Sequence, residues 1–223
     1  MNNPGMMPMS VAEIAEAVHG RLVAGAIDVN APVATSAFTD SRQIVDGSVF
    51  VAIAGERVDG HDFVPKVGSQ GAVAAVVDHE VEHAGVPQIV VENTVTALGA
   101  LARHNIERRR AEDDAFTVIG ITGSVGKTTT KDLLKSLLSG VGSTVAPVGS
   151  FNNEIGLPLT ALKVNAGTRF LVAEMGANHV GEIANLTSLV PPDIAVVLKV
   201  GVAHLGEFGS PERIAQAKSE IVR

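Results

Sequence analysis

The chain has 223 residues, of which 46% are hydrophobic and 18% charged, as expected of a globular protein with room for one large domain or two small ones. It contains no Cys, which excludes a disulfide framework and a thiolate metal site. The net charge of −7 and the lack of Trp and Tyr argue against a general nucleic-acid binder. No apolar run has the length of a membrane span and the first residues lack the order of a signal peptide, so we expect a cytoplasmic protein.

The first half of the chain alternates short strands with helices. Ser10 and Glu13 have the spacing of a capping box in front of a short helix. Apolar runs at residues 72–77 and 88–91 predict two strands, and residues 94–106 predict a helix. This alternation indicates a small α/β unit.

Another strand is predicted at residues 49–53, between two polar clusters. The clusters contain side chains that could bind a ligand: Thr39, Asp40, Ser41 and Arg42 before the strand, and Asp59, His61 and Asp62 after it. Two solvated loops would have the same composition, so the residues alone leave both interpretations open.

A charged run, ERRRAEDD at residues 107–114, follows this unit. Because acidic residues directly follow the three arginines, the run is more typical of a solvated linker than of a basic patch. We therefore predict two domains, residues 1–110 and residues 111–223.

The stretch FTVIGITGSVGKTTT, Phe116 to Thr130, predicts a strand, a glycine loop and the start of a helix. Glycines let backbone N–H groups face an anion, and the N-terminus of a helix favours negative charge. Lys127 can neutralise phosphate oxygens, and Thr128 can offer its hydroxyl to Mg²⁺. The residues of this expected phosphate cradle are Gly123, Ser124, Val125, Gly126, Lys127, Thr128 and Thr129.

The loop departs from the general P-loop pattern, since Ile121 stands where the first glycine is expected. A glycine turn that happens to precede a lysine is the alternative. The strand before the loop and the helix after it favour phosphate binding. Four leucines share the predicted apolar face of that helix: Leu133, Leu134, Leu137 and Leu138.

The alternation of strands and helices continues beyond the loop. Strands are predicted at residues 144–148, 170–174 and 194–200, and helices at residues 182–189 and from Ser210 onward. This order predicts a P-loop type of α/β domain with a mainly parallel sheet. Ligands bind at the carboxyl edge of such a sheet, where three candidates fall: Thr128, Glu174 and His204.

Each candidate residue also has an ordinary interpretation. Glu174 suits Mg²⁺ or an attacking water, but backbone N–H groups could also satisfy a buried carboxylate there. His204 could be a surface or hydrogen-bonded histidine. The pairs Asn152–Asn153 and Asn178–His179 are ambiguous as single residues, because asparagine is common in turns.

Four passages together make the chain resemble the Mur ligases of bacterial cell-wall synthesis. They are TDSR with DGHDF at residues 39–42 and 59–63, TGSVGKTTTK at 122–131, NNEIGLP at 152–158 and EMGANHVGEI at 174–183. The shortened glycine loop is the form that this family uses. The last two passages resemble the branch that adds D-alanyl-D-alanine to UDP-N-acetylmuramoyl-tripeptide, and the resemblance spans nearly the whole chain.

The resemblance implies roles for the matching residues. It assigns Gly123 to Thr129 to the phosphates of ATP, Thr128 and Glu174 to one Mg²⁺, and His204 to a second metal ion. Lys218 matches the lysine that this family carbamylates with CO₂. Carbamylation replaces an ammonium with a carboxylate-like oxygen ligand, which a metal ion prefers.

Both domains are implied to contact the substrate. The first domain carries its UDP-sugar end, with Thr39, Asp40, Ser41, Arg42, Asp59, His61 and Asp62 as the expected contacts. The second domain contributes Asn152, Asn153, Asn178 and His179.

The implied reaction has two steps. The carboxylate of UDP-N-acetylmuramoyl-tripeptide attacks the γ-phosphate of ATP, and the amine of D-alanyl-D-alanine then attacks the resulting acyl phosphate, so that ADP and phosphate leave. Metal ions and Lys127 would neutralise the transferred group. We expect a monomer with no nucleic-acid partner and no membrane span.

Three alternatives remain at this point. A sibling ligase that adds the third amino acid and a folylpolyglutamate synthetase-like enzyme share the glycine loop, but NNEIGLP and EMGANH argue against both. The third is a nucleotide-binding or UDP-sugar-binding module without catalysis. ATP turnover that depends on both substrates would separate the enzymes from the module.

The last predicted helix, from Ser210 to Arg223, has a start signal and no stop signal. The resemblance implies a longer central domain and a third domain, which would complete the nucleotide site and hold the dipeptide. We therefore expect the central domain to be truncated in this chain. We also expect that these 223 residues by themselves do not catalyse ligation.

Overall fold

The computed structural model describes residues 5–23, 30, 33–201 and 205–222. The chain divides into two compact units, Met1–Asn105 and Ile106–Arg223, which we describe separately. Both are α/β units, as predicted, and the mainly parallel sheet predicted for the second is present in the first as well. Within the described residues, no helix combines the length and the apolar character that crossing a membrane requires.

The first unit is built on a five-stranded sheet. Its strand order is β2 (Arg21–Val23), β7 (Gln88–Val90), β6 (Ala72–Val77), β5 (Ser48–Val51) and β4 (Ser36–Phe38). Strands β4 to β7 run parallel, and β2 pairs antiparallel with β7. A separate antiparallel pair joins β1 (Met9–Ser10) to β3 (Val33–Ala34).

Short helices complete this unit. They are α1 (Val11–Ala17), α2 (Val64–Val67) and three 3₁₀ turns, η1 (Ser41–Gln43), η2 (Gly60–Phe63) and η3 (Gly68–Gln70). The predicted cap of α1 is present, because the Ser10 hydroxyl accepts a hydrogen bond from the backbone of Glu13. Val64 and Val67 of α2 pack with Phe50 of β5 in an apolar core.

Helix α3 (Thr94–Glu112) is longer than the sequence predicts. The run at residues 107–114 is predicted as a linker, but most of it continues this helix. The reason is that Arg109 is buried, with its guanidinium donating hydrogen bonds to the Thr168 carbonyl and to Asp113. Tertiary contacts therefore give a helical role to residues whose charge suggested a solvated linker.

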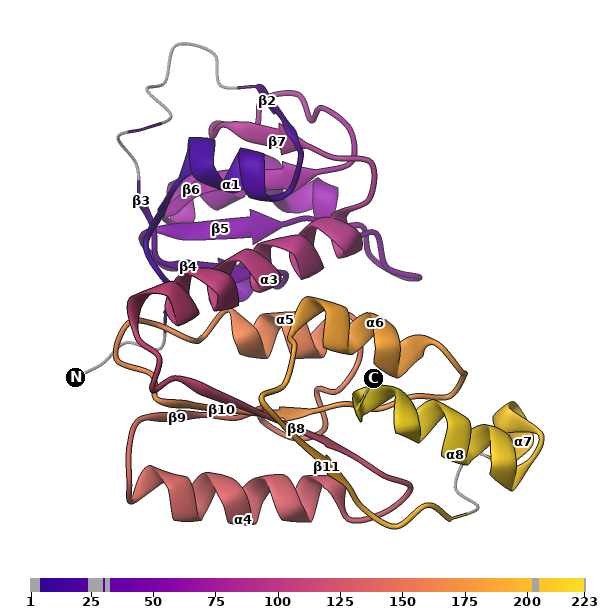
Figure 1. Ribbon diagram of the computed structural model, residues 1–223. Helices are drawn as coiled ribbons and strands as arrows, with labels where there is room; N and C mark the ends of the chain where they lie inside the picture. The colour runs from indigo at the N-terminus through magenta and orange to yellow at the C-terminus, as the bar shows by residue number, and fades with distance from the viewer. Residues whose placement is uncertain (1–4, 24–29, 31–32, 202–204, 223) are drawn as a thin grey trace. The chain divides into compact units, whose positions relative to one another are not determined.

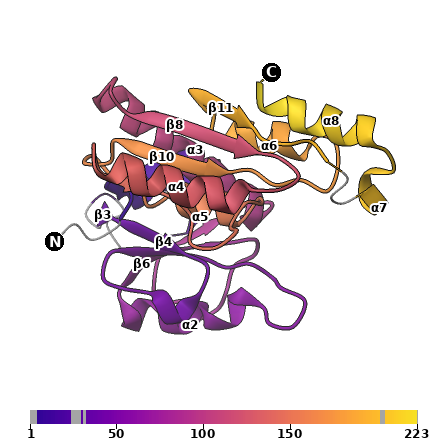
Figure 2. The ribbon, with the colours of Figure 1, turned by 90° about the horizontal axis from the view of Figure 1, so that it is seen from below.

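The second unit has a four-stranded parallel sheet. Its strand order is β11 (Ile194–Val197), β8 (Thr117–Thr122), β10 (Phe170–Glu174) and β9 (Thr144–Val145). Helix α4 (Lys127–Ser139) covers one face, and α5 (Gly156–Ala161) and α6 (Glu182–Leu189) lie on the other (Figure 1). Figure 2 shows α4 in front of the sheet. The chain continues through α7 (Leu205–Phe208), α8 (Pro211–Ser219) and η4 (Glu220–Val222).

Of the four leucines predicted to form the apolar face of α4, two pack on the sheet and two are exposed. Leu134 and Leu138 pack on the sheet core, whereas the side chains of Leu133 and Leu137 are 60% and 70% exposed. A helix that lies on a flat sheet buries a narrow stripe, so leucines one position away turn outward. At the other end of the unit, the predicted cap and first residue of α8 are confirmed as Ser210 and Pro211.

Candidate active site

The glycine loop joins the end of β8 to the start of α4 at the carboxyl edge of the sheet. Gly123 and Gly126 have φ angles of 151° and 85°, which side chains rarely adopt, and a Cβ on Gly123 would lie 2.7 Å from Leu198. The Lys127 amino group donates a hydrogen bond of 2.9 Å to the Gly123 carbonyl. The predicted strand, loop and helix are therefore all present, with Lys127 at the first position of the helix.

Glu174 ends β10 and lies beside β8, paired with Ile121. The side chain is buried, with 1% of its surface exposed, and each carboxylate oxygen accepts one side-chain hydrogen bond. The Thr128 hydroxyl donates to Oε2 over 3.1 Å, and the Asn152 amide donates to Oε1 over 2.9 Å. Among the described residues, side chains therefore satisfy this carboxylate, in place of the backbone N–H groups of the ordinary interpretation.

The donor set around Glu174 suits a hard divalent cation. A carboxylate and a hydroxyl lie in contact next to a glycine loop, and Mg²⁺ prefers such oxygen ligands. The chemistry of Glu174 and Thr128 therefore fits Mg²⁺. His204, the expected ligand of a second metal ion, lies outside the described residues.

A cavity of about 680 Å³ opens beside Lys127 and Asn152. Its walls include four residues that the sequence predicts as contacts: Lys127, Asn152, Asn153 and Asn178. Three polar residues that the sequence analysis missed also line it: Glu154, Glu182 and Asn185. Glu154 belongs to the NNEIGLP passage and Glu182 to EMGANHVGEI, so both passages already contained a signal for them.

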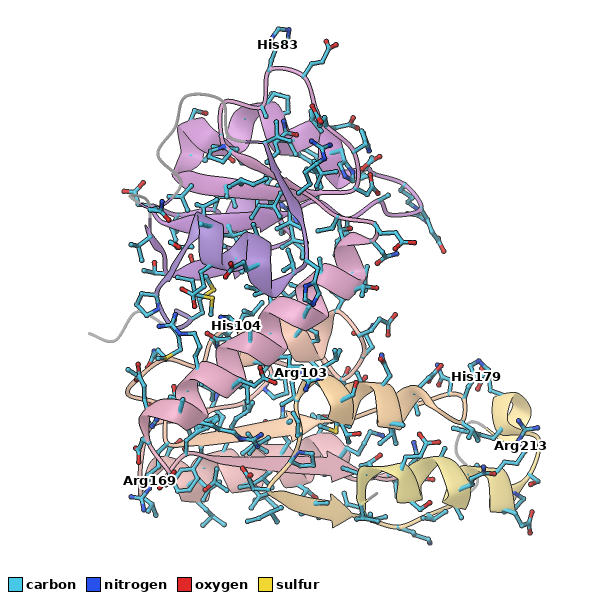
Figure 3. The ribbon with its side chains drawn as sticks, turned by 45° about the horizontal axis from the view of Figure 1, so that its top comes forward. His83, Arg103, His104, Arg169, His179 and Arg213 are labelled. Carbon is cyan, nitrogen blue, oxygen red and sulfur yellow. The ribbon has the colours of Figure 1, made fainter. Side chains whose placement is uncertain are left out.

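Several candidate residues in the cavity walls also have local structural contacts. The Asn153 side chain accepts a 2.9 Å hydrogen bond from the backbone of Gly156 at the start of α5. The Glu182 carboxylate accepts hydrogen bonds from the backbone N–H groups of Asn178 and His179. His179 is exposed, and its ring projects outward from the loop before α6 (Figure 3).

Lys218 lies on α8 with only 2% of its surface exposed. Its amino group is 3.4 Å from the Ala177 carbonyl and 5.6 Å from the centre of the Phe208 ring. Burial lowers the pKa of Lys218 from 10.5 to about 8, and the nearby positive charge of Lys127 acts in the same direction. The fold therefore places Lys218 within electrostatic reach of Lys127 in the glycine loop, and it increases the share of neutral amine relative to an ordinary lysine.

The polar cluster at residues 39–42 follows β4 in the first unit. Asp40 caps the turn η1 and pairs with Arg42 through two hydrogen bonds of 2.9 and 2.7 Å. Hydrogen bonds from Arg42 lower the pKa of Asp40 to about 2. This carboxylate is therefore charged at neutral pH, in an exposed pair between neighbouring residues.

The second cluster is centred on a buried histidine. Asp59 caps η2, and its carboxylate oxygen lies 2.6 Å from Nδ1 of His61. The backbone N–H of Asp78, just after β6, donates to Nε2 of His61 over 3.2 Å. Both ring nitrogens of His61 therefore face protein partners, whereas Asp62 is exposed.

His61, Asp78 and His79 lie close enough together to suggest a metal site among the described residues. However, the two imidazole rings are stacked, with centroids 4.4 Å apart and planes only 24° from parallel. The lone pairs of stacked rings run side by side and do not converge on one ion. We interpret this group as a hydrogen-bonded network that joins the loops after β5 and β6.

Comparison with known proteins places the chain in a family. Residues 121–223 match the Mur ligase middle domain, and residues 35–106 match the model described as Mur ligase family, catalytic domain. The UDP-N-acetylmuramoyl-tripeptide–D-alanyl-D-alanine ligase of Mycobacterium tuberculosis is 40% identical, over 97% of this chain and 46% of that protein.

Two solved structures are similar as well. A crystal structure of MurF from Acinetobacter baumannii has a TM-score of 0.84 and 38% identity, over 97% of this chain and 46% of that one. MurF ligase from Thermotoga maritima in complex with ADP has a TM-score of 0.73 and 41% identity, over 83% of this chain and 42% of that one. The chain thus spans about half the length of the relatives it matches, and it belongs to the Mur ligase family.

Proposed function

We propose that the protein carrying this chain is an ATP-dependent ligase that joins D-alanyl-D-alanine to UDP-N-acetylmuramoyl-tripeptide in the cytoplasm. The observation that carries the proposal is the contact of Thr128 and Asn152 with the buried carboxylate of Glu174, directly beside the glycine loop. The similarity to relatives named for this activity supports it.

The glycine loop is proposed to bind the phosphates of ATP, through Gly123, Ser124, Val125, Gly126, Lys127, Thr128 and Thr129. The Lys127 amino group donates a hydrogen bond to the Gly123 carbonyl of its own loop. This contact keeps the positive charge of Lys127 at the glycine loop. The similar Thermotoga maritima protein was solved with ADP, which supports the proposal that this protein binds a nucleotide.

Glu174 and Thr128 are proposed to hold Mg²⁺ through their oxygen atoms. A bound Mg²⁺ would neutralise phosphate charge during transfer. Asn152 then orients the Glu174 carboxylate, since its amide occupies the second oxygen. We keep His204 as a proposed ligand of a second metal ion.

Lys218 is proposed to be carbamylated and to serve as an oxygen ligand in this form. The reaction joins the neutral amine to CO₂ and releases one proton. A pKa near 8 leaves more neutral amine at neutral pH than an ordinary lysine has. The buried position also excludes bulk water from the amine.

The substrate is proposed to contact both units. Its UDP-sugar end is assigned to the carboxyl edge of the first sheet, where Thr39, Asp40, Ser41, Arg42, Asp59 and Asp62 lie in loops after β4 and β5. His61 is assigned to hold those loops, because both of its ring nitrogens face protein partners. The reacting end is assigned to the cavity of the second unit, with Asn152, Asn153 and Asn178 in its walls and His179 on the exposed loop before α6.

The proposal is tested by ligation with a panel of UDP-N-acetylmuramoyl peptides, ATP, Mg²⁺ and D-alanyl-D-alanine. The protein that carries this chain should form the pentapeptide product and release ADP only when both amino-acid substrates are present. ADP release with a free amino acid in place of the dipeptide would indicate a sibling ligase. Nucleotide binding without turnover by the whole protein would indicate a binding module and contradict the proposal.

A further inference from the structure

A buried lysine that the proposed reaction does not use lies one helical turn beyond Lys127. Lys131, on α4, has 2% of its surface exposed. Its amino group donates hydrogen bonds of 3.0 Å to the carbonyls of Pro147 and Gly149, and lies 2.9 Å from a carboxylate oxygen of Asp132. A lysine amino group has three donors, and each has a partner here.

The two carbonyls belong to the segment that leads to Asn152. This segment connects β9 to α5 and has no regular secondary structure at residues 146–148 or 151–152. At the end of the segment, the Asn152 carbonyl accepts a 2.9 Å hydrogen bond from the backbone N–H of Gly176, just after β10. Hydrogen bonds from Lys131 therefore hold the start of the segment, and the hydrogen bond from Gly176 to Asn152 holds its end.

The same segment determines the position of the Asn152 amide against Glu174. From α4, Thr128 contacts one oxygen of this carboxylate, and the segment held by Lys131 brings Asn152 to the other oxygen. One helix thus controls both oxygen contacts, the first directly and the second through two carbonyls. An apolar residue could fill the space of Lys131, but it could not hold these carbonyls.

We propose that Lys131 is a positioning residue that fixes the Asn152 segment, and through it the carboxylate of Glu174, for binding of Mg²⁺ and nucleotide. This inference rests on the proposed function, because it assumes that Glu174 serves a metal ion beside the glycine loop. It assigns to Lys131 no contact with substrate.

The first test needs no ligand. In the 223-residue chain, Lys131→Met should shift the NMR signal of the Asn152 side-chain amide, which is identified by its loss in Asn152→Ala. It should also speed hydrogen exchange at the backbone N–H of Gly176. Lys135→Met is the matched control, since it makes the same substitution at an exposed site one turn later on α4. Lys131→Gln, which keeps N–H donors, should shift the signal less.

The second test is a double-mutant cycle on the affinity for Mg²⁺ and ADP, measured by calorimetry. Lys131→Met and Asn152→Ala should each weaken binding about tenfold, and the double variant should lose no more than Asn152→Ala alone. Additive losses, or an unchanged Asn152 signal in folded Lys131→Met, would overturn the inference. If Lys131→Met does not fold, Lys131→Gln decides by the same criteria.

The control Lys127→Ala separates this inference from the proposed function. If Lys127→Ala does not weaken the binding of Mg²⁺ and ADP, the proposed nucleotide site itself is wrong. If Lys127→Ala weakens binding and Lys131→Met leaves both binding and the Asn152 signal unchanged, only the role of Lys131 is wrong.

Discussion

The two units both place polar side chains where parallel strands end, but they hold them in different ways. In the first unit the carboxylates of Asp40 and Asp59 have local partners, Arg42 and His61, each only two residues away. His61 adds one longer contact, because it accepts a hydrogen bond from the backbone of Asp78, 17 residues later. In the second unit Glu174 meets Thr128 across 46 residues of sequence. Loop geometry alone can form the first kind of contact, whereas the second requires the sheet to be assembled.

The contacts also differ in burial. Arg42 is exposed, whereas Glu174, Lys131 and Lys218 are almost completely covered. Water competes with an exposed pair, so its contribution to stability is small. A buried charge has only its protein partners, so removing one of them has a large effect. Substitutions at these buried residues of the second unit should therefore have much larger consequences than substitutions at the exposed Asp40–Arg42 pair of the first.

The largest effect is expected for Lys127→Ala. Removing this charge should lower ATP-dependent turnover about 100- to 1,000-fold, because the transferred phosphate loses a positive partner. The fold should persist, since Lys127 is only half-buried. Turnover is measured by ADP release, with folding checked by circular dichroism. Lys135→Ala is the control on the same helix. Unchanged turnover in Lys127→Ala would contradict the large effect expected for substitutions in the second unit.

Glu174→Gln should have the next largest effect. The substitution keeps the shape of the side chain but removes the negative charge, so the Mg²⁺ concentration for half-maximal turnover should rise on the order of 10- to 100-fold. Affinity for the UDP-substrate, assigned to the first unit, should stay the same. Mg²⁺ titrations beside substrate binding test this, with the exposed Glu212→Gln as control. Equal losses of both would mean that the metal site is misplaced.

Lys218 should make stability depend on pH in a defined window. Its pKa is about 8 when folded and 10.5 as a free side chain, so the unfolded chain binds more protons between these values. Stability relative to Lys218→Met should therefore rise as the pH increases from about 8 to 10.5, and stay low below pH 8. Urea unfolding of both proteins in CO₂-free buffer measures it. A constant difference across this range would show that Lys218 is not desolvated.

The smallest effect on stability is expected for Asp40→Asn. Asparagine can still cap η1, so only the exposed ion pair with Arg42 is lost. Because the pKa of Asp40 is lowered from 3.8 to about 2, the contribution of the charged form is present above pH 3.8 and disappears as the pH falls toward 2. Urea midpoints at neutral pH should change less than for Lys218→Met. A larger change in the urea midpoint would show that the Asp40–Arg42 pair stabilises the fold. Unchanged affinity of Asp40→Asn for the UDP-substrate would exclude Asp40 from the proposed substrate site.

Local signals in the sequence predicted much of the fold. The capping residues Ser10 and Ser210 start the helices that they were predicted to start. The predicted bounds of β6 and α6 agree with the structure. Glycine spacing identified the loop before α4, because the positive φ angles of Gly123 and Gly126 exclude most other residues. These features depend on interactions within a few residues, which the order of amino acids contains directly.

Other features could not be predicted in this way. The exposed Leu133, the helical Arg109 and the buried Lys131 each differ from what composition or periodicity suggests. In each case the decisive neighbour is distant in sequence: the sheet beneath α4, the Thr168 carbonyl, or the segment before Asn152. Helical period identifies a face of a helix, but not how much of this face the rest of the protein covers.

The sequence by itself therefore determined the α/β class, the glycine loop and the residue types available for binding phosphate and metal. Only the tertiary structure decided that Asn152 and Thr128 hold opposite oxygens of Glu174, and that Lys218 comes within electrostatic reach of Lys127. The physical reason is distance along the chain. Local conformation follows from neighbouring residues, whereas the partners and the burial of a charged group are set where β8 pairs with β10 and where α8 packs on α6.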